Sequence, residues 1–465
     1  MRTMIQFSRI FLLIFSAFLL LGCEPKGSQQ SVSTKTESFR VWMHGSVAEQ
    51  QALESIVREF LAQEKSTAQI DVFRFNSESD LRQLLLHEIA EGYAPDVVYT
   101  TPAWVIQNIN KILPNPNAEG LAKDNLLQIF IPPAVEAMII DNWVYGIPMY
   151  ADTLAIVFNR DHLITRLSST SLPAKTWVGI EKNVAELTQF DEEEKTIKTS
   201  AIALGLTENV RDAAHILANL WAVYGGNFES PDGTQIIFFR ERLGGGSIPS
   251  YNPLENATNF FISFTNKNSK NRTWNVFLAD KNTALKNFQT FVNGQVSMII
   301  TYSKNLPLIK NLADKSSARI DMGIAPFPSV SADRLLTDMK MLVVPKKSSD
   351  PNIAWRFLGF AGDKKAQQIF FEKTNLPTIR LDLMSLQKEK NSDLSVFIDQ
   401  AKRAQVWRSK NIEDEIFYQD LEKIIQAATK GQNIKKLISG LGTRYQIFVD
   451  QKNKIQATRP KKSEE

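Results

Sequence analysis

Residues 144–163 read VYGIPMYADTLAIVFNRDHL, and this stretch marks where one unit of structure gives way to another. Gly146 and Pro148 indicate a turn, because glycine and proline are the strongest local signals that interrupt regular structure. The β-rich run Thr153 to Phe158 follows almost at once, and such a run predicts a strand. The stretch therefore predicts that a new part of the fold begins shortly after residue 150.

The residues before this stretch alternate between strand patterns and helix patterns. Phe39–Gly45, Gln69–Phe75 and Pro95–Thr100 are apolar or alternating runs that predict strands. Two helix patterns with apolar stripes lie between them; the first begins at a capping box at Ser46, and the second stops at Gly92. This order predicts an α/β lobe with a mostly parallel sheet, whose ligands bind beyond the carboxyl ends of the strands.

Strand and helix patterns also follow the central stretch. Gln295–Ser303 and Asp321–Pro328 predict strands of a second lobe, and His215–Tyr224 predicts a helix that ends at a Gly-Gly pair. Met341–Lys347 predicts another strand, and the chain from there to about Val449 is mostly helical. About 440 residues beyond the leader are too many for one core and enough for two lobes.

The N-terminus has the features of an export signal. The apolar run Ile10–Leu21 follows two arginines and is shorter than the ~20 residues that span a bilayer. The letters LLGC at 20–23 resemble the bacterial lipobox, in which the cysteine sulfur carries a lipid. An ordinary signal peptide with a chance cysteine is the alternative. We predict a lipoprotein signal peptide at 1–22, lipidation of Cys23 and a flexible tether at 23–38.

The composition narrows the class of protein. With 43% hydrophobic and 22% charged residues, the sequence is typical of globular proteins. Its net charge of +4 arises from scattered Lys and Arg, so we predict no nucleic-acid partner. The single cysteine excludes an internal disulfide. Residues 456–465 are predicted to form a disordered tail.

Seven motifs together resemble the extracellular solute-binding proteins of ABC importers, of the sugar-binding type related to maltose-binding protein. They are PDVVYTTPAW (95–104), YGIPMYADTLAIVFNRD (145–161), LPAKTW (172–177), LWAVYGGNF (220–228), VNGQVSMIITYS (292–303), MGIAPFP (322–328) and AWRFLGFAGDKKAQQIFFEKTNLPTIR (354–380). The resemblance covers nearly all of the chain beyond the leader. It implies a two-lobed, type II periplasmic-binding-protein fold of class α/β, in which each lobe is a mostly parallel sheet flanked by helices, with a helical C-terminus.

The resemblance also implies an organisation and a role. Lobe 1 would comprise 39–150 and 343–385, and lobe 2 would comprise 154–338 and 386–455. The chain would cross between the lobes at 150–153 and again at 338–344. By hinge closure, this protein would capture a carbohydrate outside the cell membrane and deliver it to an ABC permease, as a monomer without a cofactor. A non-sugar solute, or a sensor as the partner, remain alternatives.

The chemistry of a sugar indicates which residues would bind it. Aromatic rings suit its apolar C–H faces, and short polar side chains suit its hydroxyls. The predicted ligand-binding residues are His44, Trp104, Tyr150, Asp152, Trp221, Asn227, Tyr302 and Trp407, the last of them on a late helix. Each aromatic could instead belong to the core, and Asp152 could merely cap a turn.

Two departures from the family stand near the expected cleft. Met339-Lys340-Met341 occupies a place where many members have small residues, and Asn375 replaces a common glycine. Residues typical of catalysis are sparse: the histidines lie far apart in sequence, and HEIAE at 87–91 lacks the second histidine of a zinc protease. We therefore predict no enzyme and no metal site. A glycoside-cleaving lipoprotein is a minor alternative, because carboxylates ~5–9.5 Å apart are visible only in three dimensions.

Overall fold

The computed structural model describes residues 38–116, 123–167, 170–191, 193, 196–243, 250–274, 278, 286–329, 334–407 and 409–458. The predicted signal peptide, Cys23, nearly all of the tether and most of the C-terminal tail lie outside these residues. The described residues belong to one compact unit that begins at Ser38.

Two mixed β-sheets organise the structure. The first contains β1 (Ser38–His44), β2 (Gln69–Phe75), β3 (Val97–Thr100), β4 (Ile112–Leu113), β7 (Gly146–Pro148) and β13 (Met341–Pro345). The second contains β8 (Leu154–Asn159), β9 (Gln189–Phe190), β10 (Ile197–Ile202), β11 (Val296–Tyr302) and β12 (Met322–Pro326). A small hairpin pairs β5 (Ile139–Ile140) with β6 (Trp143–Val144). We call each sheet, together with the helices packed on it, a lobe.

The prediction of mostly parallel sheets was wrong. In the first sheet β1 runs parallel to β2 and β3, but β13 runs antiparallel to β3, β4 and β7. In the second sheet only β10 and β11 are parallel. In the first sheet the antiparallel pairs arise at the chain crossings. β7 leaves the lobe and β13 re-enters it there, so these strands pair without the helical connection that parallel neighbours need.

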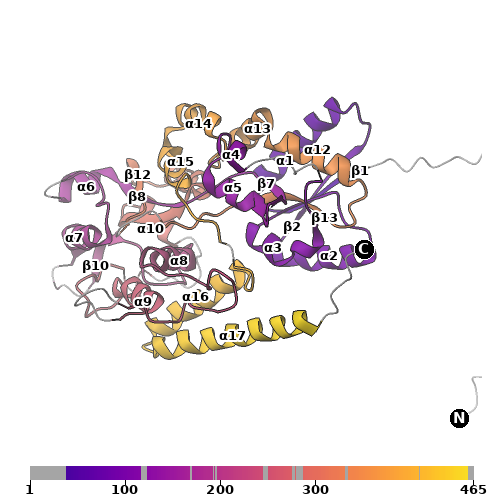
Figure 1. Cartoon of the computed structure of the whole chain (residues 1–465). Helices are drawn as coiled ribbons and strands as arrows, with labels where there is room; N and C mark the ends of the chain where they lie inside the picture. Colours follow the sequence, from indigo (N-terminus) through magenta and orange to yellow (C-terminus); the bar gives the residue numbers. More distant parts are fainter. Residues whose placement is uncertain are drawn as a thin grey trace, which may run out of the picture. The chain divides into compact units, whose positions relative to one another are not determined.

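Helices cover both sheets. They are α1 (Val47–Gln63), α2 (Glu78–Glu91), α3 (Pro102–Gln107), α4 (Lys123–Leu127), α5 (Pro132–Met138), α6 (Arg160–Arg166), α7 (Trp177–Leu187), α8 (Ala213–Val223), α9 (Pro253–Ser263), α10 (Lys286–Val292), α11 (Leu306–Asp314), α12 (Pro351–Gly362), α13 (Lys364–Thr374), α14 (Met384–Lys390), α15 (Ser395–Ala401), α16 (Asp414–Thr429) and α17 (Ile434–Thr458). In Figure 1, α5 and α12 lie along β7 of the first sheet, whereas α8, α9, α16 and α17 form a second group. None of the helices in the described ranges is long and apolar enough to cross a membrane.

The local signals act as the sequence predicts. Ser46 and Glu49 form the expected capping box: Glu49 N donates to the Ser46 hydroxyl, and Ser46 N donates to the Glu49 carboxylate. Gly92 ends α2 in the left-handed conformation at φ 87°. Asn375 ends α13 in the same conformation at φ 55°, which asparagine adopts more readily than most residues other than glycine.

The chain crosses between the sheets where β7 leads into β8. The backbones of Asp152 and Asp338 form a β-bridge at this point. The Thr337 hydroxyl also donates to the Asp152 carbonyl at 2.9 Å. Two crossing segments, 149–153 and 337–340, therefore lie side by side between the lobes.

Candidate ligand-binding cleft

A cavity of about 880 Å³ lies between the two sheets. The first lobe contributes the ends of β1 and β3 and the start of α2, including His44, Glu78 and Arg82. The second lobe contributes α8, the turn after β11 and the first turns of α16. Tyr150 and the segment 337–340 form the part of the wall nearest the crossings. This volume is in the range of small-molecule sites.

The wall of the first lobe carries a buried ion pair. Lys340 Nζ lies 2.9 Å from Glu78 Oε2 and donates to the His44 carbonyl at 2.6 Å. Burial by itself would raise the pKa of Glu78, but the charges of Lys340 and Arg82 outweigh it and hold that pKa below its usual value. Glu78 is therefore a carboxylate, and its charge is already balanced by protein groups.

A second ion pair lies beside the crossings. Lys304 Nζ is 2.6 Å from Asp338 Oδ2, and the Tyr150 hydroxyl donates to the same oxygen at 3.2 Å. Burial would raise the pKa of Asp338, but the Lys304 charge and hydrogen bond keep it below its usual range. The carboxylate is 18% exposed and the Lys304 side chain 40%, so both can still reach a molecule in the cavity.

An aromatic wall belongs to the second lobe. The His215 ring stacks on Tyr418, with centroids 3.9 Å apart and an interplanar angle of 18°. His215 Nδ1 is hydrogen-bonded to the Tyr302 hydroxyl at 3.0 Å. Burial lowers the pKa of His215, so its imidazole is neutral. Trp407 continues this wall and stacks on Phe417 at 5.0 Å.

The predicted site residues fall into three groups. His44, Tyr150 and Trp407 line the large cavity. Trp221 and Asn227, together with Trp407, line a neighbouring cavity of about 330 Å³. Trp104, Asp152 and Tyr302 line neither cavity and are at most 1% exposed.

The buried members of this set have structural partners. Trp104 packs in an apolar cluster with Val98, Ile112 and Met341. The Asp152 carboxylate accepts from the backbone N–H groups of Thr153 at 2.9 Å, Ser303 at 3.1 Å and Lys304 at 3.0 Å. Their role in binding stays a prediction. The sequence predicted that Trp407 lies on a helix, and this was wrong. Trp407 lies in the segment between α15 and α16.

Sequence reasoning missed most of the charged lining. Glu78, Arg82, Lys304 and Asp338 stand on three separate segments, and Tyr418, also missed, stands on a fourth. A single polar residue on a helix or turn carries no local signal of a site. One clue was available, because Met339 and Lys340 stood out as a departure from the family and both line the cavity.

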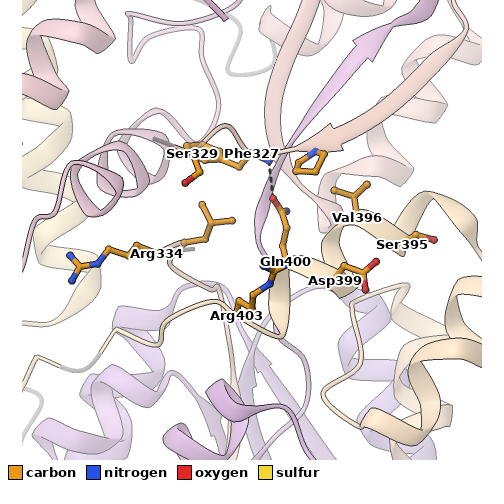
Figure 2. A pocket seen from close by; sticks show the side chains of 10 residues that line it. Phe327, Ser329, Arg334, Ser395, Val396, Asp399, Gln400 and Arg403 are labelled. Atoms are coloured by element: carbon orange, nitrogen blue, oxygen red, sulfur yellow. Dashed lines mark hydrogen bonds between the residues drawn. The ribbon is translucent and has the colours of Figure 1, made fainter. Parts of the chain in front are cut away.

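A smaller cavity of about 240 Å³ lies beside β12 and α15 (Figure 2). Figure 2 shows the Gln400 side chain reaching the Phe327 main chain, whose N–H it accepts at 2.8 Å. The Gln400 amide also donates to Thr153 Oγ1 and to the Leu154 carbonyl, both at 3.0 Å. Gln400 thus fixes the start of β8 next to the crossing, so this cavity lies against the structural support of the cleft.

The described residues contain no group of three or more His, Cys, Asp or Glu side chains placed to hold a metal ion. Glu78, Asp338, Asp414 and Glu415 of the large cavity are instead paired with lysine or arginine.

Comparisons with known proteins agree with this architecture. The maltotriose-binding protein of Pyrococcus abyssi (strain GE5 / Orsay) is 22% identical over 326 residues, which cover 68% of this chain and 61% of that relative. The sugar-binding protein MalE of Xanthomonas citri superposes with a TM-score of 0.70 at 18% identity and covers 91% of this chain and 100% of that one. The maltose/maltodextrin-binding domain MalE of Bdellovibrio bacteriovorus, bound to maltotriose, superposes with a TM-score of 0.63 at 15% identity. The superposition covers 90% of this chain and 100% of that one.

These likenesses confirm the two-lobed solute-binding fold that the sequence motifs predict. All three relatives are named as binding proteins or domains rather than enzymes. The model of one family, described as bacterial extracellular solute-binding protein, matches residues 56–393, most of the chain. The protein is therefore a member of the bacterial extracellular solute-binding protein family.

Proposed function

We propose that this protein captures a neutral saccharide in the 880 Å³ cavity and presents it to an ABC importer. The observation that carries the proposal is the pairing of charges in the wall. Glu78 is balanced by Lys340, and Asp338 by Lys304. These two ion pairs carry no net charge to offer an ionic ligand, but they keep several donors and acceptors for hydroxyls.

The aromatic wall supports the same class of ligand. Trp407, Tyr418 and the neutral His215 line the cavity on one side. Flat rings suit the apolar C–H faces of a sugar, whereas the ion pairs suit its edge. The names of relatives agree, since one binds maltotriose and a structure from Thermotoga lettingae TMO with a TM-score of 0.63 holds α-D-tagatose.

The remaining elements of the proposal rest on the sequence and the family. The mature chain is anchored by lipid at Cys23 on the extracytoplasmic face of the membrane, at the cell surface or in the periplasm. It acts there as a monomeric binding protein, not as an enzyme. The lobes comprise 39–150 with 343–385 and 154–338 with 386–455. Their closure about the paired crossing segments traps the solute, which requires that the ligand bind the closed form better than the open form.

A binding screen tests the ligand class. The purified protein is titrated with mono- and oligosaccharides, polyols, peptides and polyamines while its thermal unfolding is followed. A saccharide at ~100 times its dissociation constant should add about 2.7 kcal/mol to the free energy of unfolding. Stabilisation by polyamines or peptides but by no saccharide would contradict the proposal, and release of shorter sugars from an oligosaccharide would indicate hydrolysis instead.

A matched pair of variants tests the site. Asp338→Asn removes the carboxylate beside the crossings and should weaken saccharide binding about tenfold or more, because a charge-assisted hydrogen bond is lost. Asp393→Asn removes a carboxylate from an exposed ion pair with Lys310 elsewhere in the second lobe and should leave binding unchanged. Equal binding by both variants would remove Asp338 from the site.

A further inference from the structure

The Arg82 side chain reaches from the first lobe to the second. Its Nη1 lies 2.5 Å from Glu413 Oε2 and 3.6 Å from Glu415 Oε2, and its Nη2 lies 3.9 Å from Asp414 Oδ1. Three consecutive carboxylates at the start of α16 therefore converge on one guanidinium of α2.

The partners belong to different lobes. α2 packs on β1 and β2 of the first sheet, whereas α16 packs on α8 and α9. A weaker contact supports the same junction, because the Gln107 amide at the end of α3 lies 3.5 Å from the Ser409 carbonyl. These contacts differ from the crossing segments in one respect: no main-chain connection there forces the two sides together.

The charges at this junction are unequal. Arg82 also lies 3.5 Å from Glu78, so one cation faces four carboxylates. The positive end of the α16 dipole favours acidic residues in its first turn, yet three adjacent carboxylates repel one another. Burial raises the pKa of Asp414 to about 6 even though Arg82 acts to lower it. Without the guanidinium, this acidic turn would be less stable next to the wall of the first lobe.

The balance of attraction and desolvation favours contact. The Arg82 side chain is only 7% exposed, but Glu413 is 30% exposed and Glu415 44% exposed. Partly exposed carboxylates lose little hydration when the pair forms, so the usual penalty for burying two charges is reduced. Arg82 is held in place within its own lobe by a hydrogen bond from Nη2 to Thr101 Oγ1 at 3.2 Å, so little side-chain entropy is lost on closure.

We propose that Arg82 and the carboxylates of Glu413, Asp414 and Glu415 form an ionic latch across the cleft, which stabilises the closed form and so sets the affinity for the ligand. Arg82 acts as a positioning residue, through the separation of the lobes. The statement about affinity rests on the proposed saccharide function; the statement about closure does not. The latch makes the binding of a neutral molecule dependent on ionic strength, which direct contacts to a neutral sugar would not do.

Two measurements test the latch. The first is the affinity for a neutral saccharide from the screen, measured by calorimetry at about 0.05 M and about 0.5 M NaCl. The wild type should bind about fivefold more weakly at the higher salt concentration, at the low end of known coupling between sites. Arg82→Gln should bind about fivefold more weakly at low salt and show no salt dependence, and Arg82→Lys should recover part of both effects.

The second measurement needs no saccharide. Spin labels at Arg58→Cys in α1 and Lys182→Cys in α7, in a full-length Cys23→Ser chain, report the distance between the lobes. High salt and Arg82→Gln should both shift the distance distribution toward a more open cleft. This arm separates the two ideas: if no saccharide binds but the distance responds, the proposed function fails and the latch stands.

Control variants keep the test decisive. Lys365→Gln breaks the ion pair with Glu59 inside the first lobe and should alter neither readout. If Arg82→Gln does not fold, Glu413→Gln with Glu415→Gln tests the latch from its more exposed side. An affinity and a distance distribution that are unchanged by salt and by these substitutions would overturn the proposal.

Discussion

Asp152 and Asp338 hold the two crossing segments together through their main chains. Each backbone N–H donates to the carbonyl of the other residue at 2.8 Å. Their side chains have different surroundings. The Asp152 carboxylate accepts hydrogen bonds from three backbone N–H groups, whereas the Asp338 carboxylate lines the cavity. One bridge therefore couples the support of the hinge to the wall of the cleft.

Asp152→Ala should destabilise the fold. It leaves the N–H groups of Thr153, Ser303 and Lys304 without their acceptor, and each buried unsatisfied group costs about 1 kcal/mol or more. We expect the free energy of unfolding in urea to fall by about 3 kcal/mol. Asp321→Ala, which removes an exposed ion pair with Arg160, should change it by less than about 0.5 kcal/mol. Similar losses for both would show that the three hydrogen bonds contribute little.

His162 should make the protein sensitive to mild acid. Its Nδ1 lies 3.0 Å from Ser297 Oγ, and burial, followed by the charge of Arg166, lowers its pKa to about 4. In the unfolded chain the imidazole has a pKa of about 6.5, so between these values the unfolded state binds a proton that the native state does not. Stability is therefore complete above pH 6.5 and falls as the pH drops toward 4.

With a discount for the partly exposed ring, this loss should be about 2 kcal/mol. The measurement is the difference in the free energy of unfolding between wild type and His162→Gln across this range. His87→Gln is the control, because the His87 side chain is 67% exposed. A constant difference between wild type and His162→Gln would contradict the assignment.

Gly226→Ala should disturb the neighbouring cavity of about 330 Å³, which Gly226, Trp221 and Trp407 line. A Cβ at Gly226 would stand 2.1 Å from the Trp221 Nε1 atom, too close for any real contact, so the indole would have to move. We expect a loss of about 1–3 kcal/mol in the free energy of unfolding and a shift of the tryptophan fluorescence. Gly359→Ala is the control: a Cβ there meets nothing within 4 Å and Gly359 lies inside α12, so this change should leave the fluorescence as it is and raise the free energy of unfolding by about 0.5–1 kcal/mol.

Cys23→Ser tests the proposed anchor. Two or more acyl chains give a stable attachment to a membrane where one chain does not, so loss of the only sulfur that could carry them should release the protein into the soluble fraction. Unchanged sedimentation with membranes would show that Cys23 does not carry the anchor.

Much of the fold could be predicted from the sequence because its signals are local. The capping box at Ser46, the left-handed end of α2 at Gly92 and the β-rich run after Pro148 each act within a few residues. Strand direction could not be predicted in this way, because β13 joins the first sheet only after the chain has passed through the second lobe.

The site was harder to predict than the fold. Position at a strand end for His44, at a chain crossing for Tyr150 and aromatic type for Trp407 selected three residues that line the cavity. Similar criteria also selected Trp104, which packs in the core. Arg82 and Glu413 are 331 residues apart in sequence, and only the packing of two lobes brings them together. Charge complementarity over such a separation leaves no pattern in a single sequence.

The bridge between the crossing segments is built from backbone N–H and C=O groups, which every amino acid except proline supplies. Substitutions in the cavity lining can thus change which solute fits, while the hydrogen bonds that join the two crossing segments stay intact. A change of ligand would then need only a few new side chains in the cavity, with the same backbone connection between the lobes.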